Sequence, residues 1–306
     1  MRCLVTGSTG FIGSHLVGML LEKGCEVGVM IRPTSNLWRI QEYKLSLHIL
    51  ESDLAGMKNI EDQIMEFHPQ ILLHAGWQGV DKNQRDDVGQ IRNMQDSLKL
   101  FDTCLKSGCQ SIVGFGSQAE YGQTNRTLVE DMPTYPDTLY GAAKLLTGLL
   151  GERKCADLDV PFVWLRLTAA FGPKDDPSHL IPYVISTLLR GESPVLTHGR
   201  QKWDYLYIDD VLNAIWDIIT HSNARGIFNL SSGRAIAVSQ ICEMIRDWIN
   251  PDLPLDLGKV PYPDDARIVL EAGNSRLRQA TGWEPQISWI DGIEKTIEWY
   301  SRQVYS

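Results

Sequence analysis

T-G-S-T-G-F-I-G, at residues 6 to 13, follows an apolar run at residues 2–6 and opens a segment with helical spacing of apolar residues. Small residues at such a turn let the backbone approach a pyrophosphate, whose charge meets free N–H groups and the helix dipole. The glycine spacing, G-x-x-G-x-x-G, taken alone fits a flexible turn equally well. Directly after a strand it predicts a dinucleotide site formed by Gly7, Thr9, Gly10, Phe11, Ile12 and Gly13.

The end of the second predicted strand indicates which dinucleotide binds. M-I-R-P-T-S, at residues 30 to 35, lacks the acid that would bind a ribose 2′-hydroxyl. Arg32 is placed to pair with a 2′-phosphate, so we expect NADP (as NADPH) rather than NAD; a solvated loop arginine is the alternative. Asp53 and Leu54 follow the third predicted strand and complete the predicted site. Asp53 either accepts a hydrogen bond from the adenine amino group or makes an Asx turn.

Short β-rich runs alternate with helical segments through the first half of the chain. The runs lie at residues 2–6, 26–31, 45–50, 70–74, 111–115 and 161–167. They are almost entirely apolar, as expected of strands that are buried on both faces. The pattern predicts an α/β fold with a Rossmann-type, doubly wound parallel sheet that is covered by helices on both faces.

A second, smaller lobe follows. The alternation stops after Arg166, where Pro173, Pro177, Pro182 and Pro194 mark a loop-rich stretch. An apolar run at 227–230 predicts a return to the sheet before helices near 238–249 and 289–300. We therefore expect a discontinuous dinucleotide-binding domain of residues 1–167 and 204–232. Residues 168–203 and 233–306 form the predicted C-terminal substrate-binding lobe.

Composition argues against several classes of protein. The formal net charge of -9, without clustered Lys and Arg, argues against a nucleic-acid partner. No apolar stretch approaches the roughly 20 residues of a membrane span, and the start has no signal-peptide layout, so we expect a cytoplasmic protein without a membrane partner. The six cysteines form no C-x-x-C pair and the seven histidines no ligand-spaced cluster, so we expect no metal.

Y-G-A-A-K places Tyr140 and Lys144 four residues apart on one face of a predicted helix. A phenol with an ordinary pKa near 10 is a poor proton donor or acceptor at neutral pH, and a neighbouring ammonium lowers that pKa. The two residues then form an acid/base device. A helix pair without function is the alternative, and the glycine-rich turn upstream favours catalysis.

With these motifs the chain resembles the extended short-chain dehydrogenases/reductases, which include nucleotide-sugar epimerases, dehydratases and reductases. Further motifs that carry the resemblance are S-D-L at 52, H-A-G at 74, G-F-G-S at 114, D-Y-L-Y-I-D-D-V at 204 and G-W-E-P at 282. The resemblance implies that Tyr140 is the general acid/base, that Lys144 holds the nicotinamide ribose and that Ser117 binds the reacting carbonyl. It adds His74 and Ala75 to the cofactor site and gives Asn93 a supporting role.

Departures from the family pattern narrow the reaction. Dehydratases of the family place an Asp-Glu pair where this chain has Gln118 and Ala119, so we expect no dehydration. Glu120 comes one residue later, where an extended segment would turn its side chain away, so we expect a structural role. Arg32 indicates an exchangeable NADPH and a net reduction. The stretches H-A-G-W-Q-G at 74 and S-Q-A-E-Y-G at 117 resemble those of reductases that act on nucleotide-linked 4-keto-6-deoxysugars, so we favour an NADPH-dependent reductase of such a sugar. The alternatives are a nucleotide-sugar epimerase, a reductase of non-sugar carbonyls and an NADP-binding sensor.

The resemblance also implies a substrate site and an assembly. Ala169 and Trp203 replace an asparagine and an arginine of relatives, Arg267 matches an arginine that binds the diphosphate, and Arg200 or Lys202 could share that duty. Trp203 either stacks on a base or fills the core. The expected substrate site, for a nucleotide-diphosphate sugar, comprises Trp77, Ser117, Gln118, Tyr140, Thr168, Ala169, Trp203 and Arg267. Apolar residues on several sides of the helices at 88–106 and 139–154 predict a homodimer, as in relatives.

Overall fold

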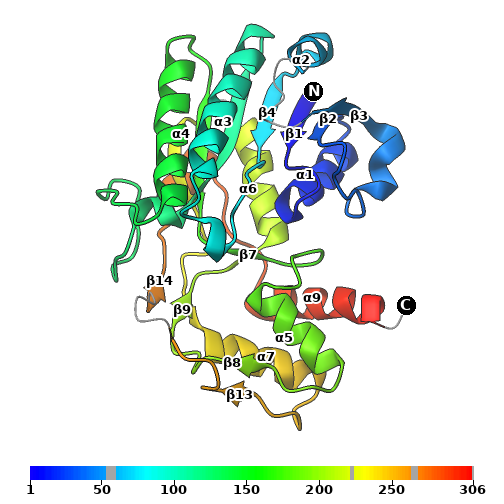
Figure 1. Ribbon diagram of the computed structural model, residues 1–306, viewed down its shortest axis with the longest axis vertical. Coiled ribbons are helices and arrows are strands. Elements are labelled where there is room, and N and C mark those ends of the chain that lie inside the picture. Colours follow the sequence, from blue (N-terminus) through cyan, green and yellow to red (C-terminus); the bar gives the residue numbers. More distant parts are fainter. Residues whose placement is uncertain (53–59, 221–223, 263–267, 305–306) are drawn as a thin grey trace.

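The computed structural model describes residues 1–52, 60–220, 224–262 and 268–304. A seven-stranded parallel sheet in the order β11-β6-β5-β4-β1-β2-β3 forms its upper part (Figure 1). The strands are β1 (Arg2–Thr6), β2 (Glu26–Ile31), β3 (Leu47–Glu51), β4 (Ile71–His74), β5 (Ser111–Ser117), β6 (Phe162–Leu167) and β11 (Gly226–Leu230). The predicted α/β class and parallel sheet are confirmed, and β3 starts after a 3₁₀ turn, η1 (Gln41–Ser46), that the sequence did not predict.

Helices cover both faces of the sheet because successive strand residues point to opposite sides. Cys3 and Val5 of β1 pack with helices α1 (Phe11–Glu22) and α6 (Ile208–Thr220). Leu4, between them, packs with the opposite helices, α2 (Glu61–Phe67), α3 (Gly89–Lys106) and α4 (Leu139–Ala156). The strand order reverses at β1, whose neighbours are β2 and β4, so the ends of β1 and β4 form the crevice where such sheets bind ligands.

The lower part of Figure 1 contains the C-terminal lobe. Its helices are α5 (Leu180–Leu189), α7 (Val238–Ile249) and α9 (Trp289–Val304), and α8 (Ser275–Thr281) lies against β11. Short strands complete this part: β7 (Ala170–Phe171), β8 (Val195–Leu196), β9 (Lys202–Trp203), β10 (Leu206–Tyr207), β12 (Ile236–Ala237), β13 (Asp256–Leu257) and β14 (Val269–Leu270). The domain boundaries at 167, 203 and 232 stay a proposal.

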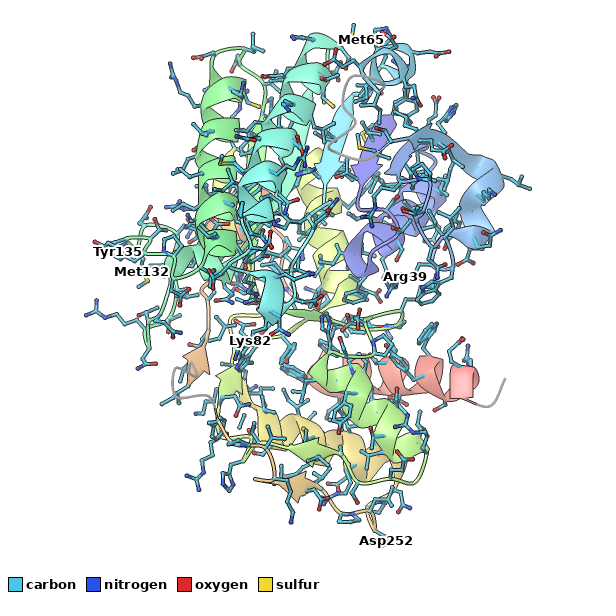
Figure 2. All side chains as sticks on the ribbon, in the orientation of Figure 1. Arg39, Met65, Lys82, Met132, Tyr135 and Asp252 are labelled. Carbon is cyan, nitrogen blue, oxygen red and sulfur yellow. The ribbon has the colours of Figure 1, made fainter. Side chains whose placement is uncertain are left out.

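Arg39 joins the two parts of the molecule (Figure 2). Its Nε donates to the carbonyl of Lys174 at 2.8 Å, and its Nη1 donates to the carbonyl of Thr9 at 3.2 Å. One guanidinium thus connects the glycine-rich turn with the segment that leads to α5. These two hydrogen bonds fix the position of the turn after β1 relative to the lower lobe.

Trp164 of β6 is fully buried where three glycines make room for it. A Cβ on Gly114 would lie 2.5 Å from the indole, a Cβ on Gly148 of α4 would lie 2.7 Å from it, and a Cβ on Gly116 would overlap it. Since real Cβ atoms do not approach so closely, the glycines and the tryptophan require one another. The close packing fixes β5, β6 and α4 against each other directly below Ser117.

No helix among the described ranges is long and apolar enough to cross a bilayer.

Candidate active site

The glycine-rich turn leaves no room for side chains at two positions. Gly7 has a positive φ of 68°, and a Cβ there would lie 2.7 Å from the backbone of Ala75. A Cβ on Gly13 would overlap the carbonyl oxygen of Gly7. The turn therefore lies in direct backbone contact with the chain after β4, and helix α1 begins with its free N–H groups at the crevice. This cradle suits a pyrophosphate.

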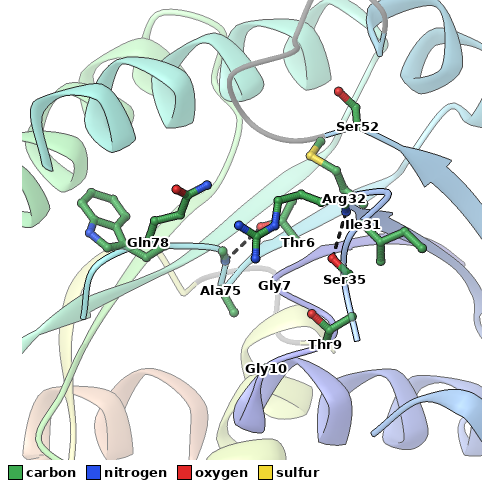
Figure 3. A pocket seen from close by; sticks show the side chains of 13 residues that line it. Thr6, Gly7, Thr9, Gly10, Ile31, Arg32, Ser35, Ser52, Ala75 and Gln78 are labelled. Carbon is green, nitrogen blue, oxygen red and sulfur yellow. Dashed lines mark hydrogen bonds between the residues drawn. The ribbon is translucent and has the colours of Figure 1, made fainter. Parts of the chain in front are cut away.

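A cavity of about 250 Å³, here called the glycine-loop cavity, lies beside this turn (Figure 3). Arg32 extends over it from the end of β2, and the Arg32 N–H donates to Ser35 Oγ at 3.0 Å. The described lining consists of Thr6, Gly7, Thr9, Gly10, Met30, Ile31, Arg32, Ser35, Ser52, Ala75, Gly76, Trp77 and Gln78. The structure thus brings Gly7, Thr9, Gly10, Arg32 and Ala75 of the predicted cofactor site to one cavity.

A second cavity of about 640 Å³, here called the lobe cavity, opens between the sheet and the C-terminal part. Its lining includes Ser117, Gln118, Tyr140, Thr168, Ala169 and Trp203 of the predicted substrate site. Phe11 and Ile12 also line it, although we expected both in the cofactor site. Asp53, Leu54 and Arg267 lie outside the described residues.

Trp77 lies between the two cavities. It lines the glycine-loop cavity rather than the lobe cavity, which differs from its predicted place in the substrate site. Its ring is edge-on to Tyr140 with centroids 6.3 Å apart, and its Nε1 donates to Gln90 Oε1 at 2.7 Å. Trp77 of the glycine-loop cavity and Tyr140 of the lobe cavity are thus in ring contact, so a hydride donor in one cavity and a sugar carbon in the other would have to meet near Tyr140.

Tyr140 stands in the first turn of α4, where Thr138 caps the helix by accepting from the Gly141 N–H. Burial raises the pKa of the Tyr140 phenol, and a hydrogen bond with Ser117 and the charge of Arg85 oppose that rise. Ser117 ends β5, so the two hydroxyl residues come from neighbouring elements. A protonated phenol beside a second hydroxyl can donate a proton to a carbonyl oxygen and take it back.

Lys144 lies one turn after Tyr140 and is buried. Its Nζ donates to the Phe115 carbonyl at 2.6 Å and lies 3.9 Å from the ring centre of Trp77. Burial lowers the pKa of Lys144 to about 7, against the opposing charge of Glu120. Lys144 Nζ lies 5.9 Å from the ring centre of Tyr140, and the pKa of that phenol is raised by burial rather than lowered as the sequence predicted.

His74 has a different role from the predicted one. Its Nδ1 is 2.8 Å from Thr6 Oγ1 and its Nε2 is 2.9 Å from Ser97 Oγ, so both ring nitrogens are occupied. Its side chain is buried and does not line the glycine-loop cavity. Thr6 Oγ1 also accepts from the Gly76 N–H at 3.1 Å, which fixes the backbone around Ala75. His74 thus supports the cavity wall rather than contacting a ligand with its ring.

His74 predicts a specific loss of stability in acid. Burial, followed by the charge of Lys144, lowers its pKa from 6.5 to about 3. Between those values only the unfolded chain binds this proton, so the stability present above pH 6.5 is lost as the pH falls towards 3. We expect His74→Gln to remove a slope of about 1.4 kcal/mol per pH unit in urea unfolding. His48→Gln, at a side chain that is 56% exposed, is the control; equal slopes in all three proteins would contradict the assignment.

Glu120 lies in a 3₁₀ turn, η4 (Gln118–Tyr121), and not in the extended segment that we expected. The turn forms because Ser117 Oγ accepts from the Ala119 N–H and the Glu120 carboxylate accepts from the Ser117 N–H. The carboxylate is fully buried and paired with Arg166, as the expected structural role would require. It is not free to serve as the missing dehydratase acid.

Arg85 is a site residue that sequence reasoning missed. Its guanidinium lies 5.3 Å from the ring centre of Tyr140, and its carbonyl accepts from the Tyr140 N–H at 2.8 Å. Arg85 also lines the lobe cavity, as does Lys82, which lies at the boundary of the two parts (Figure 2). No motif surrounds these residues, so only the folded chain reveals them. Asn93, given a supporting role, donates from Nδ2 to the Gln78 carbonyl at 2.8 Å and does support this segment.

Within the described ranges there is no group of three or more His, Cys, Asp or Glu residues that could hold a metal ion.

Known proteins resemble this chain over nearly its whole length. A UDP-glucose 4-epimerase of Corynebacterium glutamicum is 27% identical over 94% of this chain and 91% of its own. A probable dTDP-glucose 4,6-dehydratase of Sinorhizobium fredii is 27% identical over 98% and 93%. A UDP-glucose 4-epimerase of Thermotoga maritima, solved with UDP-glucose, superposes with a TM-score of 0.90 at 24% identity, covering 99% and 100%.

The sequence profile of the NAD dependent epimerase/dehydratase family matches residues 3–231, from β1 to the residue after β11. The match covers the glycine-rich turn, which lines the glycine-loop cavity, Ser117 and Tyr140, which line the lobe cavity, and Lys144. This chain belongs to the NAD dependent epimerase/dehydratase family.

Proposed function

We propose that this chain is an NAD(P)-dependent epimerase of a nucleotide-linked sugar. The observation that carries the proposal is the place of Tyr140, next to Ser117 in the lobe cavity and edge-on to Trp77 of the glycine-loop cavity. Several similar proteins are named UDP-glucose 4-epimerase, which favours this alternative over the ketosugar reductase that we favoured from the sequence. Other similar proteins are named dTDP-glucose 4,6-dehydratase, but dehydration does not fit the residues of this chain, since Gln118 and Ala119 cannot transfer protons and Glu120 is paired with Arg166.

The residues present fit a nicotinamide dinucleotide. Cβ atoms at Gly7 and Gly13 would collide with the protein's own backbone, so the glycines allow a tight turn, and Gly7, Thr9 and Gly10 of this turn line the glycine-loop cavity. When bound, such a cofactor would supply the acceptor and donor of the hydride. Tyr140 would take the proton of the sugar hydroxyl during oxidation and return it during reduction. Ser117 would hold that oxygen, while Lys144 and Arg85 would favour the phenolate.

A specific observation keeps the reductase as a second candidate. The lining of the glycine-loop cavity at the end of β2 contains Arg32 and Ser35 and no acidic residue among those described. An arginine there suits the 2′-phosphate of NADPH, a cofactor that donates its hydride once and leaves. The reductase would convert a nucleotide-linked 4-keto-6-deoxysugar to the 4-hydroxy sugar with Tyr140 as proton donor.

The two candidates differ in net redox change. We would incubate the protein with UDP-glucose and catalytic NAD or NADP, follow UDP-galactose by chromatography, and record absorbance at the wavelength of the reduced cofactor. An epimerase forms product without net change in reduced cofactor. Stoichiometric oxidation of NADPH with a panel of nucleotide-linked 4-keto-6-deoxysugars would instead establish the reductase. Binding of cofactor without turnover in either assay would contradict both.

Arg32→Ala tests the preference for NADP. We expect the Kd for NADPH to rise by about 10- to 100-fold, because the substitution removes a charge-assisted pair worth roughly 1.5–3 kcal/mol. The Kd for NADH should change by less than about threefold, since NADH has no 2′-phosphate. Fluorescence titration with both cofactors measures the two constants. Arg225→Ala, which removes a surface ion pair with Asp159, is the control; equal losses for NADPH and NADH in Arg32→Ala would contradict the prediction.

A homodimer formed by α3 and α4 remains our proposal for the assembly. The two helices lie side by side at the edge of the molecule (Figure 1). Ile91 of α3 is 46% exposed, and Leu146, Leu149 and Leu150 of α4 are 45%, 45% and 42% exposed. Sedimentation as a monomer at micromolar concentration would contradict the dimer. The cytoplasmic location expected from the sequence stays a prediction.

A further inference from the structure

The carboxylate of Glu120 is the most tightly held charge next to the proposed catalytic residues. Its Oε1 accepts from the Ser117 N–H at 2.9 Å and from Trp164 Nε1 at 2.9 Å. Its Oε2 accepts from Arg166 Nε at 2.7 Å. Glu120 and Arg166 are 0% and 3% exposed, so water does not screen these bonds. The carboxylate therefore links the end of β5 to Trp164 and Arg166 of β6.

Ser117 is fixed through both its peptide and its side chain. The Ser117 N–H is bound by Glu120, and Ser117 Oγ accepts from the Ala119 N–H at 3.2 Å. A hydroxyl has one donor and two acceptor sites, so its proton and one acceptor site remain for Tyr140 or a substrate oxygen. Tyr140, whose pKa burial raises and Ser117 lowers, lies next to this remaining capacity. By fixing the Ser117 peptide, Glu120 thus also fixes the direction of the Ser117 hydroxyl.

We propose that Glu120 is a positioning residue for the reaction and acts through Ser117. Its carboxylate, neutralised by Arg166, holds the Ser117 peptide so that the hydroxyl faces the reacting oxygen beside Tyr140. The inference rests on the proposed function, because it takes Ser117 to contact the substrate. A buried ion pair is weak evidence for a role in stability, since apolar residues of similar volume often replace such pairs without loss. The hydrogen bond from the Ser117 N–H to Glu120 instead accounts for the position of the Glu120–Arg166 ion pair beside Ser117.

The test is a double-mutant cycle between Glu120→Gln and Ser117→Ala. An amide has one oxygen, and we expect it to face Arg166, the stronger donor, which leaves the Ser117 N–H without an acceptor. We expect kcat to fall by roughly 10- to 100-fold, because small misplacements cost about that much, while KM and the Kd for the cofactor change by less than about twofold. In the Ser117→Ala background Glu120→Gln should cost less than about twofold. Multiplicative losses, or an unchanged kcat, would overturn the proposal.

Two further variants separate positioning from folding. Asp210→Asn, in α6, removes another fully buried carboxylate. This carboxylate accepts hydrogen bonds from the backbone N–H groups of Gln286 and Ile287. The substitution should lower the Tm and leave kcat unchanged. If Glu120→Gln does not fold, Glu120→Leu with Arg166→Met removes both charges at similar volume. This double variant should fold and still lose at least about tenfold in kcat, because nothing holds the Ser117 peptide; full activity would overturn the proposal.

A measurement without substrate distinguishes this proposal from the proposed function. We expect exchange of the Ser117 amide proton, followed by NMR, to speed up by at least about tenfold in Glu120→Gln, since the loss of a bond worth roughly 1.5 kcal/mol opens this peptide. Asp210→Asn should leave that rate unchanged. Faster exchange without turnover of any nucleotide sugar by the native protein would refute the proposed function and would leave standing only that Glu120 holds the Ser117 peptide. Unaltered exchange in Glu120→Gln would refute the positioning role itself.

Discussion

Tyr140→Phe is expected to lower kcat by roughly a thousandfold, because a positioned acid/base group contributes about 10²- to 10⁴-fold. The phenol is buried, and Tyr140 and Ser117 both line the lobe cavity. The phenylalanine ring keeps the edge-to-face contact with Trp77 and the contact with the Arg85 guanidinium. We therefore expect the Kd for the cofactor to stay within about twofold. Steady-state kinetics and fluorescence titration on the same preparation measure both quantities.

Tyr121→Phe is the matched control for this substitution. Tyr121 is also buried, and its hydroxyl donates to Asn229 Oδ1 at 2.6 Å, away from the lobe cavity. Tyr121→Phe also removes a buried hydroxyl, and it should lower the free energy of unfolding by about 1 kcal/mol without changing kcat. Retention of more than a tenth of the native kcat by Tyr140→Phe would show that another group transfers the proton.

Gly13→Ala should abolish useful cofactor binding. The new Cβ overlaps the carbonyl oxygen of Gly7 and would lie 2.6 Å from its carbonyl carbon, so the turn has to move. Overpacking of this kind costs about 1–3 kcal/mol, and because the displaced groups are those of the cradle, we expect the Kd to rise by about 100-fold. Calorimetric titration gives the affinity, and thermal unfolding gives the loss of stability.

Gly273→Ala separates this local effect from the general cost of losing a glycine. A Cβ on Gly273 would meet Val129 Cγ1 at 3.7 Å, an ordinary contact, and Gly273 lines neither of the two cavities. The control should bind cofactor as the native protein does. If Gly13→Ala also bound normally, the turn would not be the pyrophosphate cradle.

Much of the fold was predictable because its signals are local in the sequence. Strands buried on both faces are continuous apolar runs, and the seven runs assigned to the sheet all became its strands within one to two residues at most of their ends. Ser117, Tyr140 and the turn at Gly7 were predictable in the same way, since each belongs to a short motif with its own spacing. The structure brings these residues to adjoining cavities.

The rest depends on contacts between residues far apart in the chain. Glu120 meets Arg166 46 positions later, and His74 meets Thr6 68 positions earlier, and no local pattern encodes either pair. The extended backbone expected around Glu120 was wrong because the Ser117 side chain could cap a turn there. The preference for a reductase rested on Arg32 and on two short stretches, at residues 74–79 and 117–122, and such local signals cannot outweigh resemblance over a whole chain to proteins named as epimerases and dehydratases.

The packing around the Trp164 indole makes four positions, 114, 116, 148 and 164, depend on one another. Any side chain at Gly114, Gly116 or Gly148 would demand a smaller residue at 164, and a smaller residue at 164 would leave a void that those glycines cannot fill. Homologues should therefore vary at these positions together or not at all. A homologue without the tryptophan would also lose one of the donors to Glu120, so substitutions in this part of the interior would affect the carboxylate that holds Ser117, the proposed site residue.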